Sequence, residues 1–506
     1  MPKGAVVAVL LAGLLGLSGC VGEGDALRPA PTGSGDVAPA TEDVPAGLER
    51  FYGQQLSWSS CGGNDCAVLE VPIDYTDPGA GSVGIALERA PATRDAIGTL
   101  VVNPGGPGVP GTDMAANADG YFAPELLAAY DVVGFDPRGT GDSDPIDCLT
   151  DGELDAYLAE DPSPDTPDEE EEFAATGERF WEGCEERSSA IAGHVSTVEV
   201  ARDMDVLRAV LGEQQLDYFG FSYGTLLGAT YAELFPERVG RFALDGAEDP
   251  ALSSLESSLS QAEGFETALR AYVSDCVDGG SCFLGDSLQE GLDTISELFD
   301  EIDAEPLPTN QARDLQVGNA FYGVIFPLYL KDYWPALDKG LNEALEGDGS
   351  TLLLLADLYA DRKGGRYTSN LLEALPLINC LDDPFAIAPE EVPDQMPAFE
   401  AASPTFGDVF AWGMTSCDGI PFTATDEPDL VIDGAGAAPI VVIGTTRDPA
   451  TPYQEAVALA DELESGVLVS RDGDGHTAYN RGNDCIDDAV HGYLVDGVVP
   501  EDGLEC

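Results

Sequence analysis

Short apolar runs alternate with amphipathic helical patterns in the first half of the chain and again near its end. The expected strands cover residues 67–74, 83–92, 98–103, 131–135, 241–244, 440–444 and 467–470, together with a run that begins at Leu216. The expected helices between them cover residues 198–211, 226–235, 453–463 and 485–495. Strands that alternate with helices through Gly-rich turns favour an α/β fold with a mostly parallel sheet covered on both faces.

Helical patterns replace the strands between residues 250 and 433. They cover residues 253–276, 288–304, 317–345 and 351–361. We interpret this stretch, residues 250–433, as a helical lid inserted into an α/β core that comprises residues 47–249 and 434–506. The lid contains an aromatic cluster, which we expect to be mostly hydrophobic core with some members available to line a cleft: Phe321, Tyr322, Phe326, Tyr329, Tyr333 and Trp334.

The first residues have the pattern of an export signal. Lys3 precedes an apolar run over residues 5–17, and Leu-Ser-Gly-Cys then ends at Cys20. A short positive region, an apolar segment of this length and small residues after it are typical of a signal peptide and not of a membrane-spanning helix. The ending resembles a bacterial lipobox, so we interpret residues 1–19 as a lipoprotein signal peptide and Cys20 as the lipidated membrane anchor, with a plain signal peptide as the alternative. Residues 20–46 are rich in Gly, Pro and Ala and are expected to form a flexible tether.

The composition is strongly acidic. The 506 residues include 93 acidic and 22 basic side chains, and the formal net charge is −71. Such a balance argues against nucleic acid as a partner, because phosphate backbones are bound by clustered Lys and Arg. A hydrophobic content of 44% is enough for a sizeable core.

The chain contains eleven cysteines. Without Cys20 they form an even set, and in an exported chain an even set implies disulfides rather than reactive thiols or metal ligands. The sequence does not determine the connectivity strictly, but loop closure favours sequential neighbours. The candidate pairs are Cys61–Cys66, Cys148–Cys184, Cys276–Cys282, Cys380–Cys417 and Cys485–Cys506.

One stretch predicts a catalytic nucleophile. The run that begins at Leu216 enters Gly220-Phe-Ser222-Tyr-Gly224, and a helical segment follows. A serine on such a sharp strand-to-helix turn is exposed above the sheet, and the flanking glycines avoid collisions across the turn. The Tyr223 N–H would lie at a helix N-terminus, directed at developing negative charge. An ordinary Gly-rich turn is the alternative to a nucleophilic Ser222.

Two further turns follow expected strands. Residues 104–111 are rich in Gly and Pro and could supply backbone N–H groups to an oxyanion hole, with a phosphate-binding loop or a structural turn as alternatives. Arg138 follows the next strand and is expected to clamp neighbouring loops rather than act in catalysis. Farther along, Ser196 and Glu199 have the spacing of a capping box for the helix at 198–211.

A serine nucleophile needs a base, and the chain has three histidines. His476 follows a Gly-rich turn after the last expected strand, whereas the positions of His194 and His491 favour structural roles. The order of the nucleophile, Asp448 and His476 is that of α/β-hydrolases. Asp448 would orient the imidazole and stabilise the imidazolium. Asp245 also ends a strand and is the alternative acid.

Short motifs along the chain carry a resemblance to a known family: Asn103-Pro-Gly-Gly-Pro-Gly108, Asp136-Pro-Arg-Gly-Thr-Gly141, Gly220-Phe-Ser-Tyr-Gly-Thr225, Leu244-Asp-Gly246, Thr446-Arg-Asp-Pro-Ala-Thr-Pro452 and Gly475-His476. They resemble the exported actinobacterial tripeptidyl aminopeptidase family, which is related to prolyl iminopeptidases and ends in a TAP-like C-terminal domain. The resemblance extends from Ser57 to Cys506, and it implies an α/β-hydrolase fold.

The resemblance also implies a serine aminopeptidase that hydrolyses peptides from a free N-terminus through an acyl-enzyme. It assigns the roles of nucleophile, acid and base to Ser222, Asp448 and His476, and it places the N–H groups of Gly106 and Tyr223 in the oxyanion hole. The alternative functions are a carboxylesterase with the same triad and a non-catalytic surface lipoprotein. No metal or organic cofactor is implied.

The sequence departs from the related enzymes at two positions. Pro104 stands where prolyl iminopeptidases have His, and Ile420 follows Cys417-Asp-Gly where Trp is expected. The cleft beside the lid could therefore differ in shape. An exopeptidase must in addition pair the ammonium group of its substrate with buried carboxylates. The candidate carboxylates are Glu248, Asp249, Asp382 and Asp418.

Overall fold

The computed structural model describes residues 44–424 and 430–506. The expected signal peptide, the expected lipidation site Cys20 and most of the expected tether lie outside the described residues. None of the helices within these two ranges combines the length and the apolar character needed to cross a bilayer.

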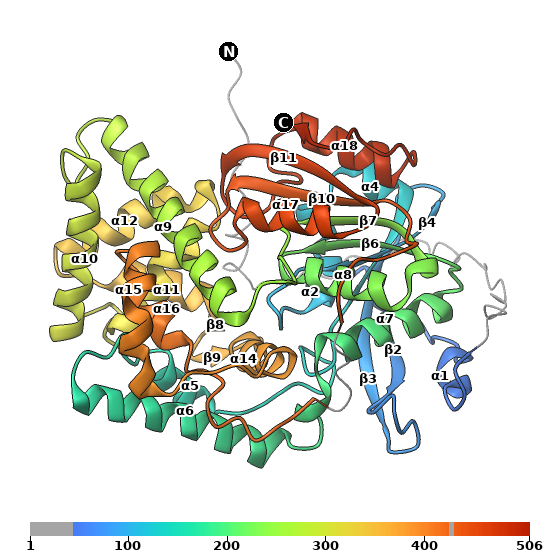
Figure 1. Ribbon diagram of the computed structural model, residues 1–506, viewed down its shortest axis with the longest axis horizontal. Helices are drawn as coiled ribbons and strands as arrows, with labels where there is room; N and C mark the ends of the chain where they lie inside the picture. Colours follow the sequence, from blue (N-terminus) through green and yellow to red (C-terminus); the bar gives the residue numbers. More distant parts are fainter. Residues whose placement is uncertain (1–43, 425–429) are drawn as a thin grey trace, which may run out of the picture.

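A ten-stranded sheet forms the centre of the described part of the chain (Figure 1). Its strands lie in the order β1-β2-β3-β5-β4-β6-β7-β10-β11-β12, antiparallel up to the β3–β5 pair and parallel from β5 to β12. The strands are β1 Ser59–Cys61, β2 Asn64–Pro72, β3 Ser82–Ala90, β4 Gly98–Asn103, β5 Tyr130–Phe135, β6 Leu216–Phe221, β7 Val239–Asp245, β10 Ile440–Arg447, β11 Gly466–Asp474 and β12 Leu504–Glu505. The expected mostly parallel sheet of an α/β-hydrolase fold is confirmed.

Alternate residues of the central strands face two separate hydrophobic cores. Tyr218 and Leu244 belong to one core, and their neighbours Phe219 and Ala243 belong to the other. Helices α7, α8 and α17 cover the first face, and α2, α3, α4 and α18 cover the second. The helices of the core are α1 Glu49–Tyr52, α2 Gly111–Ala116, α3 Ala118–Tyr121, α4 Pro124–Ala129, α7 Thr197–Leu211, α8 Tyr223–Leu234, α17 Tyr453–Glu462 and α18 Asp484–Leu494, with 3-10 turns η1 Ala192–His194 and η2 Pro236–Arg238.

The lid is a helical body beside the sheet (Figure 1). It has hydrophobic cores of its own, centred on α9 to α13 and on α15 and α16. Its elements are α9 Ser254–Asp278, α10 Leu288–Ala304, α11 Val317–Leu328, η3 Lys331–Tyr333, α12 Trp334–Leu345, α13 Ser350–Tyr359, the hairpin β8 Arg362–Lys363 and β9 Arg366–Tyr367, α14 Leu371–Asp382, η4 Pro389–Glu391, α15 Val392–Ala402 and α16 Gly407–Gly413.

Two helices that precede the lid in sequence also pack against it. α5 (Asp151–Tyr157) and α6 (Pro167–Ser188) lie along the lid, and the rings of Phe173 and Trp412 meet edge to face with centroids 5.5 Å apart. Leu154 of α5 shares a small core with Ala360 after α13. We therefore propose that the lid comprises residues 250–433 together with α5 and α6.

The structure corrects the expected single helix at 317–345. The helix breaks into α11, η3 and α12, and Leu330 between them is extended, with φ −141° and ψ 125°. Pro327 near the end of α11 and Pro335 at the start of α12 account for the break, because proline cannot donate the helical hydrogen bond. Helices α14 to α16 were not anticipated from the sequence.

The capping box expected at Ser196 and Glu199 is wrong. The Ser196 side chain accepts no capping bond. Glu199 is buried and accepts hydrogen bonds from Arg138 at 2.9 Å and from Arg202 at 2.8 Å. The Thr197 N–H at the start of α7 instead donates to Asp382 at the end of α14, at 2.8 Å. A carboxylate of the lid thus caps a helix of the core.

Arg138 clamps loops of the core, as expected. Its guanidinium is fully buried and donates to both oxygens of Asp203 at 2.6 and 2.7 Å. It also donates to Glu199 and to the backbone carbonyls of Pro72, Ile73 and His194. Each donor of a buried charge needs an acceptor, and this set supplies them from three parts of the chain.

Five disulfides join cysteines of the described residues in the pairs of sequential neighbours expected above: Cys61–Cys66, Cys148–Cys184, Cys276–Cys282, Cys380–Cys417 and Cys485–Cys506. Such a set of disulfides is typical of an oxidising compartment. The folded chain is therefore an extracytoplasmic protein.

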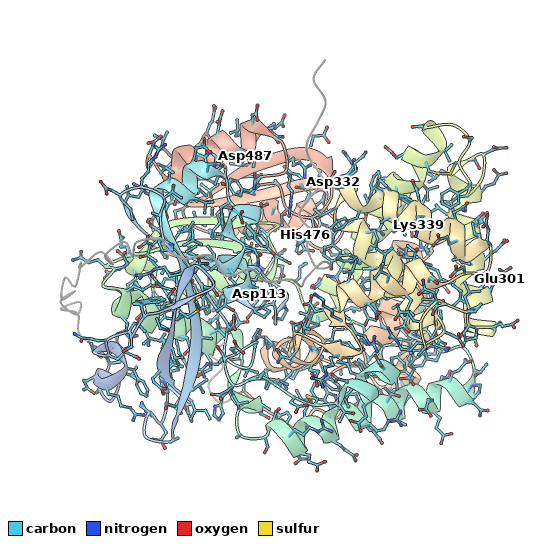
Figure 2. The ribbon with its side chains drawn as sticks, turned by 180° about the vertical axis from the view of Figure 1, so that it is seen from behind. Asp113, Glu301, Asp332, Lys339, His476 and Asp487 are labelled. Atoms are coloured by element: carbon cyan, nitrogen blue, oxygen red, sulfur yellow. A yellow bond between two sulfur atoms is a disulfide. The ribbon has the colours of Figure 1, made fainter. Side chains whose placement is uncertain are left out.

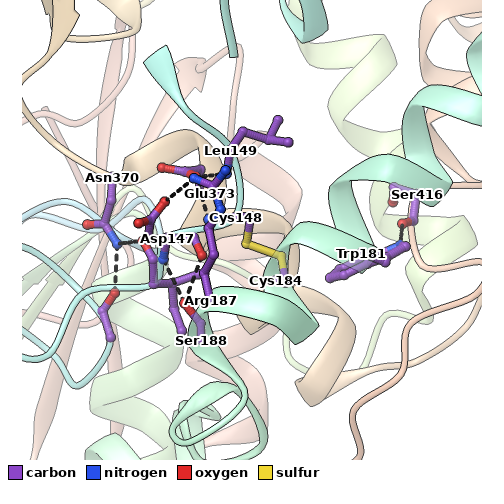
Figure 3. Close-up of a disulfide and its surroundings, with 12 residues drawn as sticks. Asp147, Cys148, Leu149, Trp181, Cys184, Arg187, Ser188, Asn370, Glu373 and Ser416 are labelled. Atoms are coloured by element: carbon purple, nitrogen blue, oxygen red, sulfur yellow. Dashed lines mark hydrogen bonds and ion pairs between the residues drawn. A yellow bond between two sulfur atoms is a disulfide. The ribbon is translucent and has the colours of Figure 1, made fainter. Parts of the chain in front are cut away.

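Helix α14 fastens the lid to the core beside one of these disulfides (Figure 3). The buried Glu373 carboxylate accepts the N–H groups of Cys148 at 2.7 Å and Leu149 at 2.8 Å. Asn370 donates to the carbonyls of Gly139 at 2.8 Å and Ile146 at 2.9 Å. The lid is thus attached to the core loop that follows β5 through buried polar contacts.

Replacing Glu373 with alanine is expected to lower the free energy of unfolding by about 2–4 kcal/mol, because the buried N–H of Cys148 and the partly buried N–H of Leu149 lose their acceptor. Urea denaturation with the disulfides intact measures this change. Glu400→Ala, at an exposed position of α15, is the matched control. Equal stability of the two variants would contradict the role of Glu373 as an anchor of the lid.

Candidate active site

The turn between β6 and α8 holds Ser222 in a strained conformation. Its φ is 55° and its ψ is −129°, a region that residues with a side chain rarely adopt. The Ser222 N–H donates to the Asp245 carbonyl at 2.9 Å, and the Ser222 carbonyl accepts the Thr225 N–H and hydroxyl, both at 2.7 Å. These bonds offset the strain and fix the backbone that carries the Ser222 hydroxyl.

Two glycines let backbones meet around Ser222. A Cβ on Gly220 would lie 2.2 Å from the Gly224 carbonyl oxygen, so a side chain there would prevent the sharp turn. A Cβ on Gly105 would lie 2.8 Å from Ser222 Cβ and 3.3 Å from the Tyr223 nitrogen. The loop after β4 therefore lies directly against the Ser222 turn.

The backbone N–H groups of Gly106 and Tyr223 belong to the two loops that meet at Ser222. Within residues 44–424 and 430–506 neither donates to a protein acceptor, whereas the Gly105 N–H donates to Asn103 Oδ1 at 2.9 Å. Backbone donors without an acceptor beside a strained serine meet the requirement of an oxyanion hole, which must bind negative charge that develops during reaction.

The structure brings His476 and Asp448 together. His476 follows β11 and Asp448 follows β10, and the imidazole Nδ1 lies 2.8 and 3.0 Å from the two Asp448 oxygens. The same carboxylate accepts the N–H groups of Ala450 and Thr451, both at 3.0 Å, and of Thr477 at 3.1 Å. These donors hold the carboxylate in the position where it accepts the Nδ1 proton, which leaves Nε2 free to accept another.

Asp245, the alternative acid, contacts the His476 loop in a different way. Its fully buried carboxylate accepts the N–H groups of Ala478 at 2.9 Å and Tyr479 at 2.8 Å. Burial raises the pKa of Asp245 to about 6. Asp448, and not Asp245, therefore contacts the imidazole, while Asp245 holds the loop that carries it.

The lid also touches His476. The His476 N–H donates to the Tyr329 carbonyl at 2.7 Å, and the two rings meet edge to face with centroids 5.5 Å apart. Burial acts to lower the pKa of His476, but the Asp448 charge and hydrogen bond oppose it. The net effect raises the pKa of His476 above its ordinary value.

A pocket of about 150 Å³ opens beside His476. Its lining is mostly apolar and aromatic, and it combines residues of the core with residues of the lid: Pro104, Met114, Tyr121, Phe221, Tyr329, Leu330, His476, Thr477, Tyr479 and Arg481. Tyr329 is thus a member of the predicted aromatic cluster that lines a cleft. Met114, Phe221 and Tyr479 belong to the core on the second face of the sheet, so the pocket lies on that side.

The predicted carboxylates lie in different surroundings. Asp382 is bound to Thr197, through N–H and hydroxyl, and Asp418 is exposed. Glu248 is half-buried, and its N–H donates to Thr225 Oγ1 at 3.0 Å on the first face of the sheet. Burial raises the pKa of Glu248 to about 7, and the nearby His476 acts in the opposite direction. In the described part of the chain no hydrogen bond or ion pair engages the Glu248 carboxylate.

Sequence reasoning missed Glu455, a second acid in this region. It is 6% exposed, accepts the Ser260 hydroxyl of α9 at 2.6 Å, and burial raises its pKa to about 8, with Glu248 acting in the same direction. Glu455 and the buried Leu459 lie four residues apart on one face of α17. The sequence does contain a signal for this residue, because an acidic side chain on the apolar face of a helix indicates a buried carboxylate.

Two groups of potential metal ligands occur among the described residues, Cys61 with Cys66 and Glu88, and Asp161 with Glu169 and Asp303. The first contains a disulfide, whose sulfurs are not thiolates. Neither group includes a residue of the pocket beside His476.

Comparison with known proteins decides the family. The serine protease Hip1 of Mycobacterium tuberculosis is 36% identical over 484 residues, which cover 90% of this chain and 92% of the relative. The chain belongs to the TAP-like family of actinobacterial α/β hydrolases. The family model described as TAP-like protein matches residues 403–506. Carboxylesterase B of the same organism is 36% identical over 94% of this chain and 95% of the relative, and the tripeptidyl aminopeptidase of Streptomyces lividans is 29% identical over 89% and 86%.

The TAP-like family contains serine hydrolases, and this chain is one of them. Its C-terminal matched segment carries Asp448 and His476, whereas Ser222 comes from the preceding part of the core. The hydrolase therefore assembles its candidate site from both parts of the core, across the inserted lid.

A fluorophosphonate, which phosphonylates activated serines, is expected to label the wild-type protein at Ser222. Ser222→Ala is expected to abolish labelling, since among the serines of the described residues Ser222 alone combines a strained strand-to-helix turn with adjacent unpaired backbone donors. In-gel fluorescence and peptide mass spectrometry measure the reaction, with the exposed Ser257→Ala as control. Undiminished labelling of Ser222→Ala would contradict this assignment.

Use of His476 as a base predicts loss of ester hydrolysis as pH falls, because protonated imidazole accepts no proton. Since the pKa of His476 is raised, the midpoint should lie above the ordinary value of about 6.5. Asp448→Asn removes the charge that raises this pKa, so the midpoint should move down and kcat should fall by up to about 10⁴. Rates measured from pH 5 to 9 test this; a flat profile speaks against His476.

Proposed function

We propose that this serine hydrolase is a peptidase that removes short peptides from a free N-terminus. Its relatives include proteins named serine protease and tripeptidyl aminopeptidase, and those names supply the class of substrate. The observation that supports recognition of a free N-terminus is the Glu248 carboxylate, half-buried near His476 and, among the described residues, without a partner. A partly buried carboxylate without a partner gains from a cationic ligand.

In the proposed mechanism Ser222 Oγ attacks the scissile carbonyl carbon while His476 Nε2 accepts the hydroxyl proton. Asp448 holds the imidazole in the tautomer that leaves Nε2 free and stabilises the imidazolium. The N–H groups of Gly106 and Tyr223 donate to the oxyanion of the tetrahedral intermediate. His476 then gives its proton to the leaving amine, the acyl-enzyme forms, and water activated by His476 releases the N-terminal peptide.

The electrostatics around Glu248 suit an ammonium group. Burial favours the neutral acid, so without a ligand the pKa of Glu248 lies at about 7. An ammonium beside the carboxylate would lower this pKa and form a charge-assisted hydrogen bond. Glu455, Asp249 and Glu462 lie in the same acidic neighbourhood, and burial raises the pKa of Glu462 to about 7, with Asp249 acting in the same direction.

A carboxylesterase is the second candidate, because Carboxylesterase B is as similar to this chain as the serine protease is. The largely apolar pocket beside His476 would suit an ester. The two activities would share Ser222, His476 and Asp448 and differ in their need for Glu248.

We also propose that the mature protein is held on the outer face of the membrane. The lipobox-like ending at Cys20 and the Gly- and Pro-rich residues that follow support a lipid anchor and a tether. Incorporation of a radiolabelled fatty acid, lost in Cys20→Ala, tests this assignment.

Replacing Glu248 with glutamine is expected to raise KM for a tripeptide anilide with a free N-terminus by about tenfold or more, since one charge-assisted hydrogen bond is lost. In the wild type the same KM should rise as pH falls below about 7, where Glu248 becomes protonated. The N-acetylated anilide and a short ester do not need the Glu248 carboxylate. Their KM values should therefore be the same for the wild type and for Glu248→Gln.

The matched control is Glu237→Gln, which is exposed and precedes β7, at the end of the strand away from Ser222. Cleavage of the ester with no cleavage of either peptide would favour the carboxylesterase. Equal use of the free and acetylated peptides by the wild type would remove the argument for a free N-terminus.

A further inference from the structure

Arg481 stands at the pocket beside His476 on a firmly held loop. Asp245 binds the N–H groups of Ala478 and Tyr479, and the Asn480 N–H donates to Asp487 at 2.8 Å. Asn480 has a positive φ of 57°, and its side chain donates to the Tyr121 carbonyl at 3.2 Å. The backbone that carries Arg481 is therefore fixed at the junction of sheet and lid, where Figure 2 shows His476.

The charge of Arg481 is not engaged by a protein partner. Within the described ranges its guanidinium forms no ion pair or hydrogen bond, although acidic residues outnumber basic ones by 93 to 22. Arg481 is exposed at the pocket, whereas Arg447 on the neighbouring strand pairs with Asp472 at 2.9 Å and with Asp474 at 2.5 Å. Of the residues that line the pocket, Arg481 is the only Lys or Arg.

The pocket and Glu248 lie on opposite sides of the nucleophile. Phe221 and Met114 of the pocket belong to the core on the second face of the sheet, whereas Glu248 is bonded to Thr225 of α8, which covers the first face. Ser222 lies between Phe221 and α8. Groups on the two sides can therefore contact the two halves of one substrate.

We propose that this pocket binds the leaving part of the peptide and that Arg481 binds its terminal carboxylate. The proposal rests on the peptidase function proposed above. The leaving amine must receive its proton from His476, which lines the pocket. A guanidinium presents a planar pair of donors that matches a carboxylate. A volume of about 150 Å³ is below the about 300–1,000 Å³ of pockets for larger ligands, so it fits a leaving group of one or two residues.

The side of the molecule on which Figure 2 shows His476 also carries acidic side chains. Asp113, Asp332 and Asp487 are on this side of the molecule (Figure 2), and the net charge is −71. These charges disfavour anions over the acidic surface, and Arg481 is the cationic side chain that lines the pocket, so a carboxylate bound in the pocket would be stabilised beside it. The tyrosines Tyr121 and Tyr333 lie close enough to Arg481 for its charge to act on their hydroxyls.

The test uses one peptide with a single residue beyond the scissile bond, offered as the free acid, as the carboxamide and as an anilide without that residue. For the wild type, kcat/KM of the acid should exceed that of the carboxamide by about tenfold or more, mainly through KM. In Arg481→Gln the ratio of kcat/KM for the acid to that for the carboxamide should fall to about one, because the loss on the acid exceeds any loss on the two uncharged substrates. Arg481→Lys should keep part of the preference for the acid, since lysine keeps the positive charge but lacks the planar pair of guanidinium donors.

Arg94→Gln is the matched control, because Arg94 is exposed and precedes β4 at the opposite end of the parallel strands. Equal cleavage of acid and carboxamide by the wild type would overturn the carboxylate subsite and leave the peptidase function intact. An equal loss on all three substrates in Arg481→Gln would also overturn it, since that points to damage of the whole site. Failure to cleave any of the three would overturn both proposals together.

Discussion

Asp245 is the residue on which the arrangement of the site depends. Its backbone carbonyl accepts the N–H of Ser222, and its carboxylate accepts the N–H groups of Ala478 and Tyr479. One residue at the end of a central strand thus ties the serine turn to the loop that carries the histidine. Both segments contain positive φ values, 55° at Ser222 and 66° at Thr477, and such conformations cost about 1–3 kcal/mol each. The hydrogen bonds from Ser222, Ala478 and Tyr479 to Asp245, and from Thr477 to Asp448, offset this cost.

Much of the core could be predicted from the sequence, because its signals are local. Apolar runs that end in Gly-rich turns gave the parallel strands, and Gly220 and Gly224 around Ser222 gave the serine turn. The choice between Asp245 and Asp448 could not be made locally, since both acids end a strand. The choice depends on which of the two carboxylates contacts the His476 imidazole in the folded sheet, and this is a tertiary contact.

The features that the sequence predicted wrongly or did not reveal have physical causes beyond the local sequence. Ser196 and Glu199 have a capping spacing, but the buried guanidinium of Arg138 requires Glu199 as an acceptor, and a lid carboxylate takes over the cap. Pro327 and Pro335 divide the helix expected at 317–345. Both prolines are present in the sequence, but the helical periodicity on either side of them favoured a single continuous helix. The packing of α5 and α6 against the lid depends on contacts with residues more than a hundred positions away, which periodicity does not report.

The disulfides have a consequence for biogenesis. Each pair closes before the next begins, at sequence separations of 5, 36, 6, 37 and 21 residues, so no bridge encloses or crosses another. A chain threaded N-terminus first through a translocation channel exposes its thiols in the same order. An oxidant that joins each newly exposed thiol to the preceding unpaired thiol would therefore produce the native pairing without disulfide exchange. This order requires that the Cys20 thiol is already modified and cannot form a disulfide.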